Sequence, residues 1–122
     1  MIDQAKRRRV LFIEDEPALR ISYERFFRPR YAMTFASSGA EALARLAEAT
    51  PDVVVLDMRL PDTDGLELLR RIRDTRADVP VIITTAYVSI EPQLRVLDLA
   101  HSAYLIKPFD LDELGAAIDR AG

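Results

Sequence analysis

Short apolar segments alternate with longer amphipathic segments along the chain. The apolar segments cover residues 10–13, 31–36, 53–56, 81–83 and 104–106. Four of them are continuous apolar runs, which is typical of strands covered by helices on both faces of a sheet. The segment 31–36 instead alternates large and small side chains, so we expect a half-covered edge strand there.

Segments of helix length separate these strands, with apolar residues recurring every three or four positions. They cover residues 17–27, 38–47, 64–75, 90–99 and 110–121. Glu41 follows a cap residue at Ser37 or Ser38, and Glu113 follows Asp110 by three residues, as in helix N-terminal capping boxes.

The alternation of strand and helix predicts an α/β fold, in which right-handed crossovers place helices on both faces of a parallel sheet. We expect one domain over residues 1–122, with its core at about 8–121 and an N-terminal tail at 1–7. The sequence contains no internal repeat and no low-complexity segment.

Composition excludes several kinds of chemistry. The 122 residues are 49% hydrophobic and 30% charged, as in soluble globular domains. The absence of cysteine excludes disulfides, thiolate metal sites and cysteine catalysis, and a single histidine excludes a multi-histidine metal site. No apolar run approaches the roughly 18 residues that span a bilayer, so we expect a cytoplasmic protein that does not enter membranes.

The charge distribution gives little support for nucleic-acid binding, because the net charge is −3. A basic run at residues 6–9 is most simply a solvated surface, with a phosphate-contacting patch as the alternative. We expect no direct nucleic-acid binding by this domain.

Polar residues follow the predicted strands at their carboxyl ends, where open parallel sheets bind ligands. They are Glu14, Asp15 and Glu16 after the first strand, Asp57 after the third, Thr84 and Thr85 after the fourth, and Lys107 after the fifth. Converging acids repel one another unless a cation lies between them, and Mg²⁺ prefers such oxygen ligands.

A phosphoryl group fits the remaining residues of this edge. Lys107 offers a positive charge and Thr85 a hydroxyl to phosphoryl oxygens. Asp57 follows a wholly apolar strand, so a rigidly held carboxylate is available to attack phosphorus and form an aspartyl-phosphate.

Each residue also has an ordinary structural explanation. Glu14 to Glu16 complement a helix dipole, Asp57 caps a strand, Thr85 is a loop residue, and Lys107 is a surface lysine. One phosphoryl site accounts for all of them together, whereas the separate explanations require independent coincidences.

Four motifs carry a resemblance to a known family. They are Glu14-Asp15-Glu16-Pro17, the segment from Asp57 to Gly65 (DMRLPDTDG), Thr85-Ala86-Tyr87 and Lys107-Pro108-Phe109. Together they resemble the receiver domains of two-component response regulators over nearly the whole chain. The resemblance implies a flavodoxin-like receiver fold, with a five-stranded parallel sheet in the order 2-1-3-4-5.

The resemblance also implies a role for each site residue. Asp57 is then the phosphoacceptor, and Lys107 forms an ion pair with the phosphoryl group. Glu14, Asp15, Asp57 and the backbone carbonyl of Arg59 are the implied ligands of Mg²⁺.

The resemblance also implies switch residues and residues that control the access of water to the phosphoryl site. Thr85 and Tyr104 match the switch residues of the family, and the Lys107–Pro108 peptide bond is expected to be cis. Arg59 and Tyr87 flank the phosphoryl site, where bulky groups are expected to slow the attack of water.

Three departures from the family pattern affect these expectations. Glu14 stands where an aspartate is common, so its longer side chain shifts its contact with the metal. Val88 replaces a frequent glycine, and Ala100-His101 replaces a common Gly-Ala pair before the last strand. His101 is not expected to donate the phosphoryl group.

The resemblance implies a signalling switch rather than an enzyme that acts on other molecules: it catalyses only its own phosphorylation and slow dephosphorylation. The implied partners are a sensor histidine kinase or phosphotransfer protein, which docks at residues 17–23, and an output domain or downstream protein. Segments 90–99, 104–106 and 110–121 form the expected switching face, with a homodimer through this face as one of the alternatives.

Three rival functions share parts of this pattern. An aspartyl-phosphate hydrolase usually has a second acid two residues after its nucleophile, where this chain has Arg59. A pseudo-receiver would lack part of the set that is intact here. A flavin-binding module would have a Ser/Thr/Gly-rich phosphate loop after the first strand, where this chain is acidic.

Overall fold

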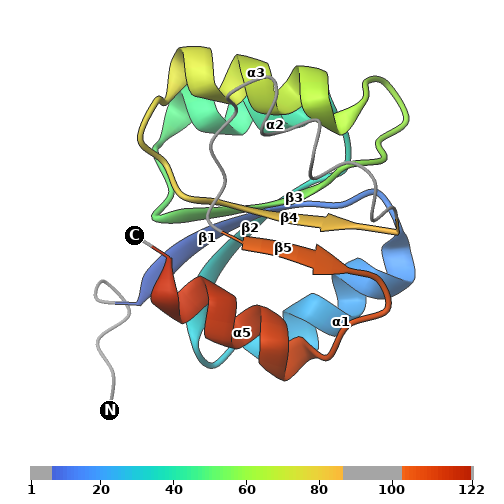
Figure 1. Ribbon diagram of the computed structural model, residues 1–122. Helices are drawn as coiled ribbons and strands as arrows, with labels where there is room; N and C mark the ends of the chain where they lie inside the picture. The colour runs from blue at the N-terminus through green and yellow to red at the C-terminus, as the bar shows by residue number, and fades with distance from the viewer. Residues whose placement is uncertain (1–6, 87–102, 122) are drawn as a thin grey trace.

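The computed structural model describes residues 7–86 and 103–121, which form one parallel sheet with helices on both faces (Figure 1). The strands are β1 (Arg8–Ile13), β2 (Tyr31–Ala36), β3 (Val53–Asp57), β4 (Val81–Thr85) and β5 (Ala103–Ile106). They lie in the order β2-β1-β3-β4-β5, and each neighbouring pair is parallel. The predicted fold class and strand order are therefore confirmed.

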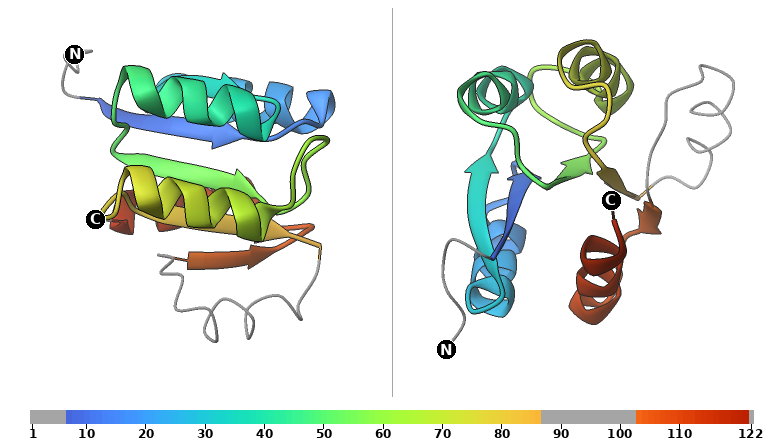
Figure 2. Two further views of the ribbon diagram at one scale, coloured as in Figure 1. Left: turned by 90° about the horizontal axis from the view of Figure 1, so that it is seen from above. Right: turned by 90° about the vertical axis from the view of Figure 1, so that its left-hand side faces the viewer.

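Two layers of helices cover the sheet. The described helices are α1 (Pro17–Phe27), α2 (Gly39–Glu48), α3 (Gly65–Thr75) and α5 (Leu111–Arg120). Helices α2 and α3 lie on one face, and α1 and α5 lie on the other (Figure 2). The helix predicted at residues 90–99 lies outside the described residues. Within residues 7–86 and 103–121, no helix has the length and apolar character needed to cross a membrane.

The strands divide their buried side chains between the two faces. Every residue of β3 is buried, with Val54 and Leu56 packed on the α2/α3 side and Val53 and Val55 on the α1/α5 side. Since side chains alternate along a strand, Asp57 faces the same side as Val55. At the sheet edge, β2 buries only its first and last residues, in agreement with the expected half-covered edge strand.

The helix N-termini follow the predicted capping chemistry, with small shifts. The hydroxyl of Ser38 accepts a hydrogen bond from the Glu41 N–H at 3.1 Å, so Ser38 rather than Ser37 is the cap of α2. Asp64, predicted as a helical residue, is instead the N-cap of α3 and accepts from the Glu67 N–H at 2.8 Å. Asp and Ser favour cap positions because their side chains replace missing backbone acceptors.

Four strands extend beyond their apolar runs, and β3 does so by including Asp57. β1 begins at Arg8, β4 continues through Thr84 and Thr85, and β5 begins at Ala103. The backbone ladder continues through these residues regardless of side-chain polarity, which an apolar pattern alone does not detect.

Candidate functional site

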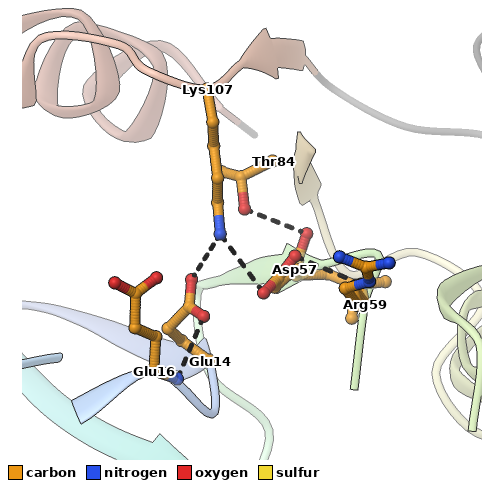
Figure 3. A network of polar contacts seen from close by, with 7 residues as sticks. Glu14, Glu16, Asp57, Arg59, Thr84 and Lys107 are labelled. Carbon is orange, nitrogen blue, oxygen red and sulfur yellow. Dashed lines mark hydrogen bonds and ion pairs between the residues drawn. The ribbon is translucent and has the colours of Figure 1, made fainter. Parts of the chain in front are cut away.

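The carboxyl ends of β1 and β3 and the residue after β5 bring three charged side chains together. The Lys107 ammonium donates to Glu14 Oε1 at 3.1 Å and to Asp57 Oδ2 at 3.3 Å (Figure 3). β1 and β3 are neighbours in the sheet and pair Ile13 with Leu56, so the next residue of each strand reaches the same edge. Asp57 and Glu14 precede Lys107 by 50 and 93 residues in the sequence, and the fold brings all three side chains together in one pocket.

Backbone hydrogen bonds hold the bases of these side chains. The N–H of Glu14 donates to the carbonyl of Ala36 at 2.9 Å, and the N–H of Lys107 donates to the carbonyl of Thr85 at 2.7 Å. Each bond continues the ladder one residue beyond the strand that it ends. The two side chains therefore leave the sheet from fixed positions, not from free loops.

Asp57 is held by different partners at its two carboxylate oxygens. Its Oδ1 accepts the N–H of Arg59 at 3.1 Å, while Oδ2 faces the Lys107 ammonium. The following residue, Met58, donates its N–H to the carbonyl of Thr84 at 3.1 Å. Asp57 is 5% exposed, so its carboxylate is almost wholly shielded from solvent.

The charges in the pocket are not balanced. Glu14 is 1% exposed, and its burial together with the neighbouring Asp57 raises its pKa to about 7, although Lys107 opposes the shift. Burial alone would lower the pKa of Lys107, but Asp57 and Glu14 outweigh it, and that pKa is raised. Two buried carboxylates thus share one ammonium group, and the pocket favours a further cation.

Asp15 adds a third carboxylate to the pocket. One carboxylate oxygen from each of Glu14, Asp15 and Asp57 lies within 4.8 Å of the others. Asp15 is exposed, whereas the other two are buried, so the group opens toward solvent on one side. A hard divalent cation with oxygen ligands and retained waters, such as Mg²⁺, fits this donor set.

The helix-dipole explanation for the first acidic motif does not account for Glu14. Helix α1 begins at Pro17 with Glu16 as its N-cap, and no side chain caps it. Glu14 ends the β1 ladder and turns into the pocket, where its Oε2 accepts the N–H of Glu16 at 3.3 Å.

The predicted switch residues lie near the pocket, and strand alternation places both on the α2/α3 side of the sheet. Thr85 is buried at the end of β4, and its carbonyl binds the N–H of Lys107. Tyr104 pairs with Ile83 in the β4–β5 ladder and packs on the α2/α3 side, opposite to the face of Asp57. The Lys107–Pro108 peptide bond is cis. The positions singled out from 87 to 101, namely Tyr87, Val88, Ala100 and His101, lie outside the described residues.

Two buried hydroxyls lie below the pocket, and neither of them is predicted from the sequence to have a role in the phosphoryl site. Thr84 lies opposite Asp57 in the β3–β4 register and donates to the carbonyl of Leu56 at 3.5 Å. Tyr23 of α1 is fully buried, so it does not belong to the docking surface expected at residues 17–23. Its hydroxyl lies beside that of Thr84 but forms no hydrogen bond of normal geometry within the described part of the chain. Tyr23 occupies an apolar position in the helical pattern, so it resembled an ordinary core residue.

Comparison with known proteins identifies the family. Residues 10–119 match the response regulator receiver domain. The chain is 40% identical over 111 residues to the response regulator MprA of Mycobacterium leprae, which covers 90% of this chain and 49% of MprA. It is 38% identical over 114 residues to the regulatory protein AtoC of Escherichia coli, which covers 93% of this chain and 25% of AtoC. The chain belongs to the response regulator receiver domain family.

Solved structures agree with this assignment. The response regulator protein TrrA of Thermotoga maritima, solved in complex with Mg(2+)-BeF, has a TM-score of 0.81 and 32% identity over 93% of this chain and 97% of that chain. The receiver domain of a sensor histidine kinase from Pseudomonas aeruginosa, solved with magnesium in its active site cleft, has a TM-score of 0.82 and 29% identity over 93% and 96%. The chain spans half or less of the length of MprA and AtoC.

Proposed function

We propose that Asp57 accepts a phosphoryl group from a phosphohistidine on a sensor histidine kinase or phosphotransfer protein. The observation that carries this proposal is the contact of Lys107 with both Glu14 and Asp57. A lysine at this place neutralises charge on a phosphoryl group that arrives at Asp57. The three clustered carboxylates supply a metal site beside the same oxygen atoms.

In the proposed reaction, a carboxylate oxygen of Asp57 forms a bond to phosphorus while the P–N bond to the donor histidine breaks. The electron pair of that bond remains on the imidazole nitrogen, which takes up a proton. The Arg59 N–H holds Asp57 Oδ1 and Lys107 faces Oδ2, so the carboxylate is oriented before the donor arrives. Such positioning and charge stabilisation dominate phosphoryl transfer.

The metal that the family implies fits the donors present here. Glu14, Asp15, Asp57 and the backbone carbonyl of Arg59 would hold Mg²⁺, which supplies charge neutralisation for phosphoryl oxygens. Without it, repulsion between Glu14 and Asp57 disfavours further negative charge in the pocket. The similar receiver domain from Pseudomonas aeruginosa, in which a magnesium ion is coordinated in the active site cleft, supports the proposal.

The proposed response to phosphorylation starts at Thr85 and Tyr104. The phosphorylated Asp57 carries new acceptor oxygens, toward which the Thr85 hydroxyl moves, and Tyr104 turns inward. The face that contains β5 and α5 then changes shape and binds an output domain, a downstream protein or a second copy. The chain acts as a switch, and its own chemistry is limited to gaining and slowly losing the phosphoryl group.

Slow loss of the phosphoryl group is proposed to depend on Arg59 and Tyr87, which stand two residues after Asp57 and Thr85. Bulky side chains there hinder the approach of water in line with the P–O bond. An Arg59→Ala, Tyr87→Ala double variant is expected to lose phosphate faster than the parent. An unchanged half-life would contradict this steric explanation.

Mg²⁺-dependent phosphorylation by a small donor, acetyl phosphate, tests the proposed function. Intact mass spectrometry is expected to detect one added phosphoryl group in the parent and none in Asp57→Ala or in excess EDTA. Asp74→Ala, which removes an exposed aspartate of α3, is the matched control and should react like the parent. Equal phosphorylation of Asp57→Ala, or none in the parent, would refute the proposal.

A further inference from the structure

A carboxylate from the loop after β3 binds the first turn of a different helix. Asp62 accepts the Gly39 N–H on Oδ1 at 2.8 Å and the Ala40 N–H on Oδ2 at 3.0 Å. These residues are 23 and 22 positions away in the sequence. The two backbone N–H groups lower the pKa of Asp62, so it remains a charged acceptor at neutral pH.

Helix α2 already has its own cap, so the contacts of Asp62 add a connection between segments. The first four N–H groups of a helix have no intrahelical acceptor. Ser38 accepts two bonds at this end, from Glu41 on its hydroxyl at 3.1 Å and from Ala42 on its carbonyl at 3.0 Å. Asp62 accepts the N–H groups of Gly39 and Ala40, and thereby fastens the β3–α3 loop to α2.

Close packing at two glycines shows how tightly the loop is seated. A Cβ atom at Gly39 would lie 2.5 Å from Cγ2 of Thr63, and one at Gly65 would lie 2.5 Å from Cα of Met58. Such distances are well inside van der Waals contact. The loop is thus fixed at its outer end against α2 and at its base against the start of α3.

The same loop carries a backbone group of the proposed metal site. Arg59 forms an antiparallel bridge with Asp64, and the Gly65 N–H donates to the carbonyl of Met58 at 2.9 Å. Arg59 also donates its N–H to Asp57. These contacts hold the backbone of Arg59 between the end of β3 and the start of α3, within the same loop that Asp62 fastens to α2.

We propose that Asp62 is a positioning residue that holds the β3–α3 loop to α2 and thereby orients the Arg59 carbonyl toward the metal. The role deepens the proposed function and rests on it, because Mg²⁺ is the metal concerned. Asp62 acts through the backbone of the loop and does not bind the metal itself. Outer groups that orient metal ligands typically change metal affinity by about 10–100-fold when they are removed.

Asp62→Ala and Ser38→Ala form a matched pair for the test. Both remove acceptors from the N-terminus of α2, but only Asp62 connects it to the loop. Isothermal titration with MgCl₂ is expected to show about tenfold weaker binding for Asp62→Ala. Ser38→Ala should bind Mg²⁺ like the parent while it lowers the unfolding midpoint.

Two further measurements keep the test decisive. Asp62→Asn retains one carbonyl oxygen and should give an affinity between those of the parent and Asp62→Ala, even if the alanine variant folds poorly. Amide hydrogen exchange at Gly39 and Ala40 should accelerate in Asp62→Ala, which measures the fastening without any metal.

The outcomes separate this role from the proposed function. If the parent binds Mg²⁺ and Asp62→Ala binds it equally well, the positioning role is refuted and the metal site stands. If Ser38→Ala weakens binding as much as Asp62→Ala does, the effect belongs to α2 in general, and the role is again refuted. If the parent itself does not bind Mg²⁺, the proposed metal site fails and the positioning role fails with it.

Discussion

Replacement of Glu14 by glutamine should stabilise the protein at alkaline pH in the absence of Mg²⁺. Glu14 is buried beside Asp57, and its pKa in the folded protein is about 7 against a reference value of 4.5. The folded state therefore binds a proton at Glu14 more tightly than the unfolded state does. This contribution to stability is fully present below pH 4.5 and is lost as the pH rises through about 7.

The magnitude follows from the size of the shift. One pKa unit corresponds to about 1.4 kcal/mol, so the shift from 4.5 to about 7 sets a ceiling of roughly 3 kcal/mol on the cost of ionised Glu14. The substitution also weakens the contact with Lys107, which offsets part of the gain. We expect Glu14→Gln to be more stable than the parent by about 1–2 kcal/mol at pH 8, and about equal to it at pH 4.5.

Urea denaturation followed by circular dichroism at several pH values is the assay. Glu16→Gln removes an exposed neighbouring carboxylate and serves as the control, with little change expected. Saturating Mg²⁺ should raise the stability of the parent more than that of Glu14→Gln, because the variant lacks one carboxylate ligand. A variant that is no more stable than the parent at pH 8, or a difference that does not depend on pH, would refute the reasoning.

Four further substitutions test buried polar groups and close packing by urea denaturation. Tyr23→Phe removes a buried hydroxyl that forms no hydrogen bond of normal geometry among the described residues and should be neutral or stabilising. Tyr31→Phe loses a 2.6 Å bond to a carboxylate and should cost about 1–2 kcal/mol. Equal losses would contradict this contrast. Gly65→Ala places a Cβ 2.5 Å from the Met58 backbone and should cost about 1–3 kcal/mol, so an unchanged midpoint would show that the loop adapts freely. Lys107→Gln leaves two carboxylates without their shared cation. It should lower stability at pH 8 by about 2 kcal/mol, since the ion pairs are only partly buried. A stability equal to that of the parent would mean that the ion pairs contribute nothing.

Hydrophobic patterning predicted the architecture because each strand is a short apolar run and each described helix repeats its apolar residues at helical spacing. Helix α1 begins at Pro17 and ends at Phe27, the same bounds that the pattern predicts. The pocket followed from one topological rule, that the carboxyl ends of parallel strands share an edge. That rule alone predicts that Glu14, Asp57 and Lys107 lie close together.

Side-chain contacts between segments that share no hydrophobic pattern could not be predicted from the sequence. Asp62 appears in the sequence as one more acid in a polar loop, and its binding to α2 depends on how two helices pack side by side. Tyr31 likewise resembled an ordinary edge-strand residue, although its hydroxyl donates to Asp119 at 2.6 Å. Arg30 binds the same carboxylate at 2.8 Å, and neither partner has a local signal in the sequence.

The central claim is that Asp57 is the residue that becomes phosphorylated, and chemical trapping tests it most directly. Borohydride reduces an aspartyl-phosphate, and peptide sequencing by mass spectrometry then locates the reduced residue. After reaction with acetyl phosphate and Mg²⁺, we expect one reduced residue, at position 57. Reduction at any other aspartate or glutamate, with Asp57 unmodified, would contradict the claim.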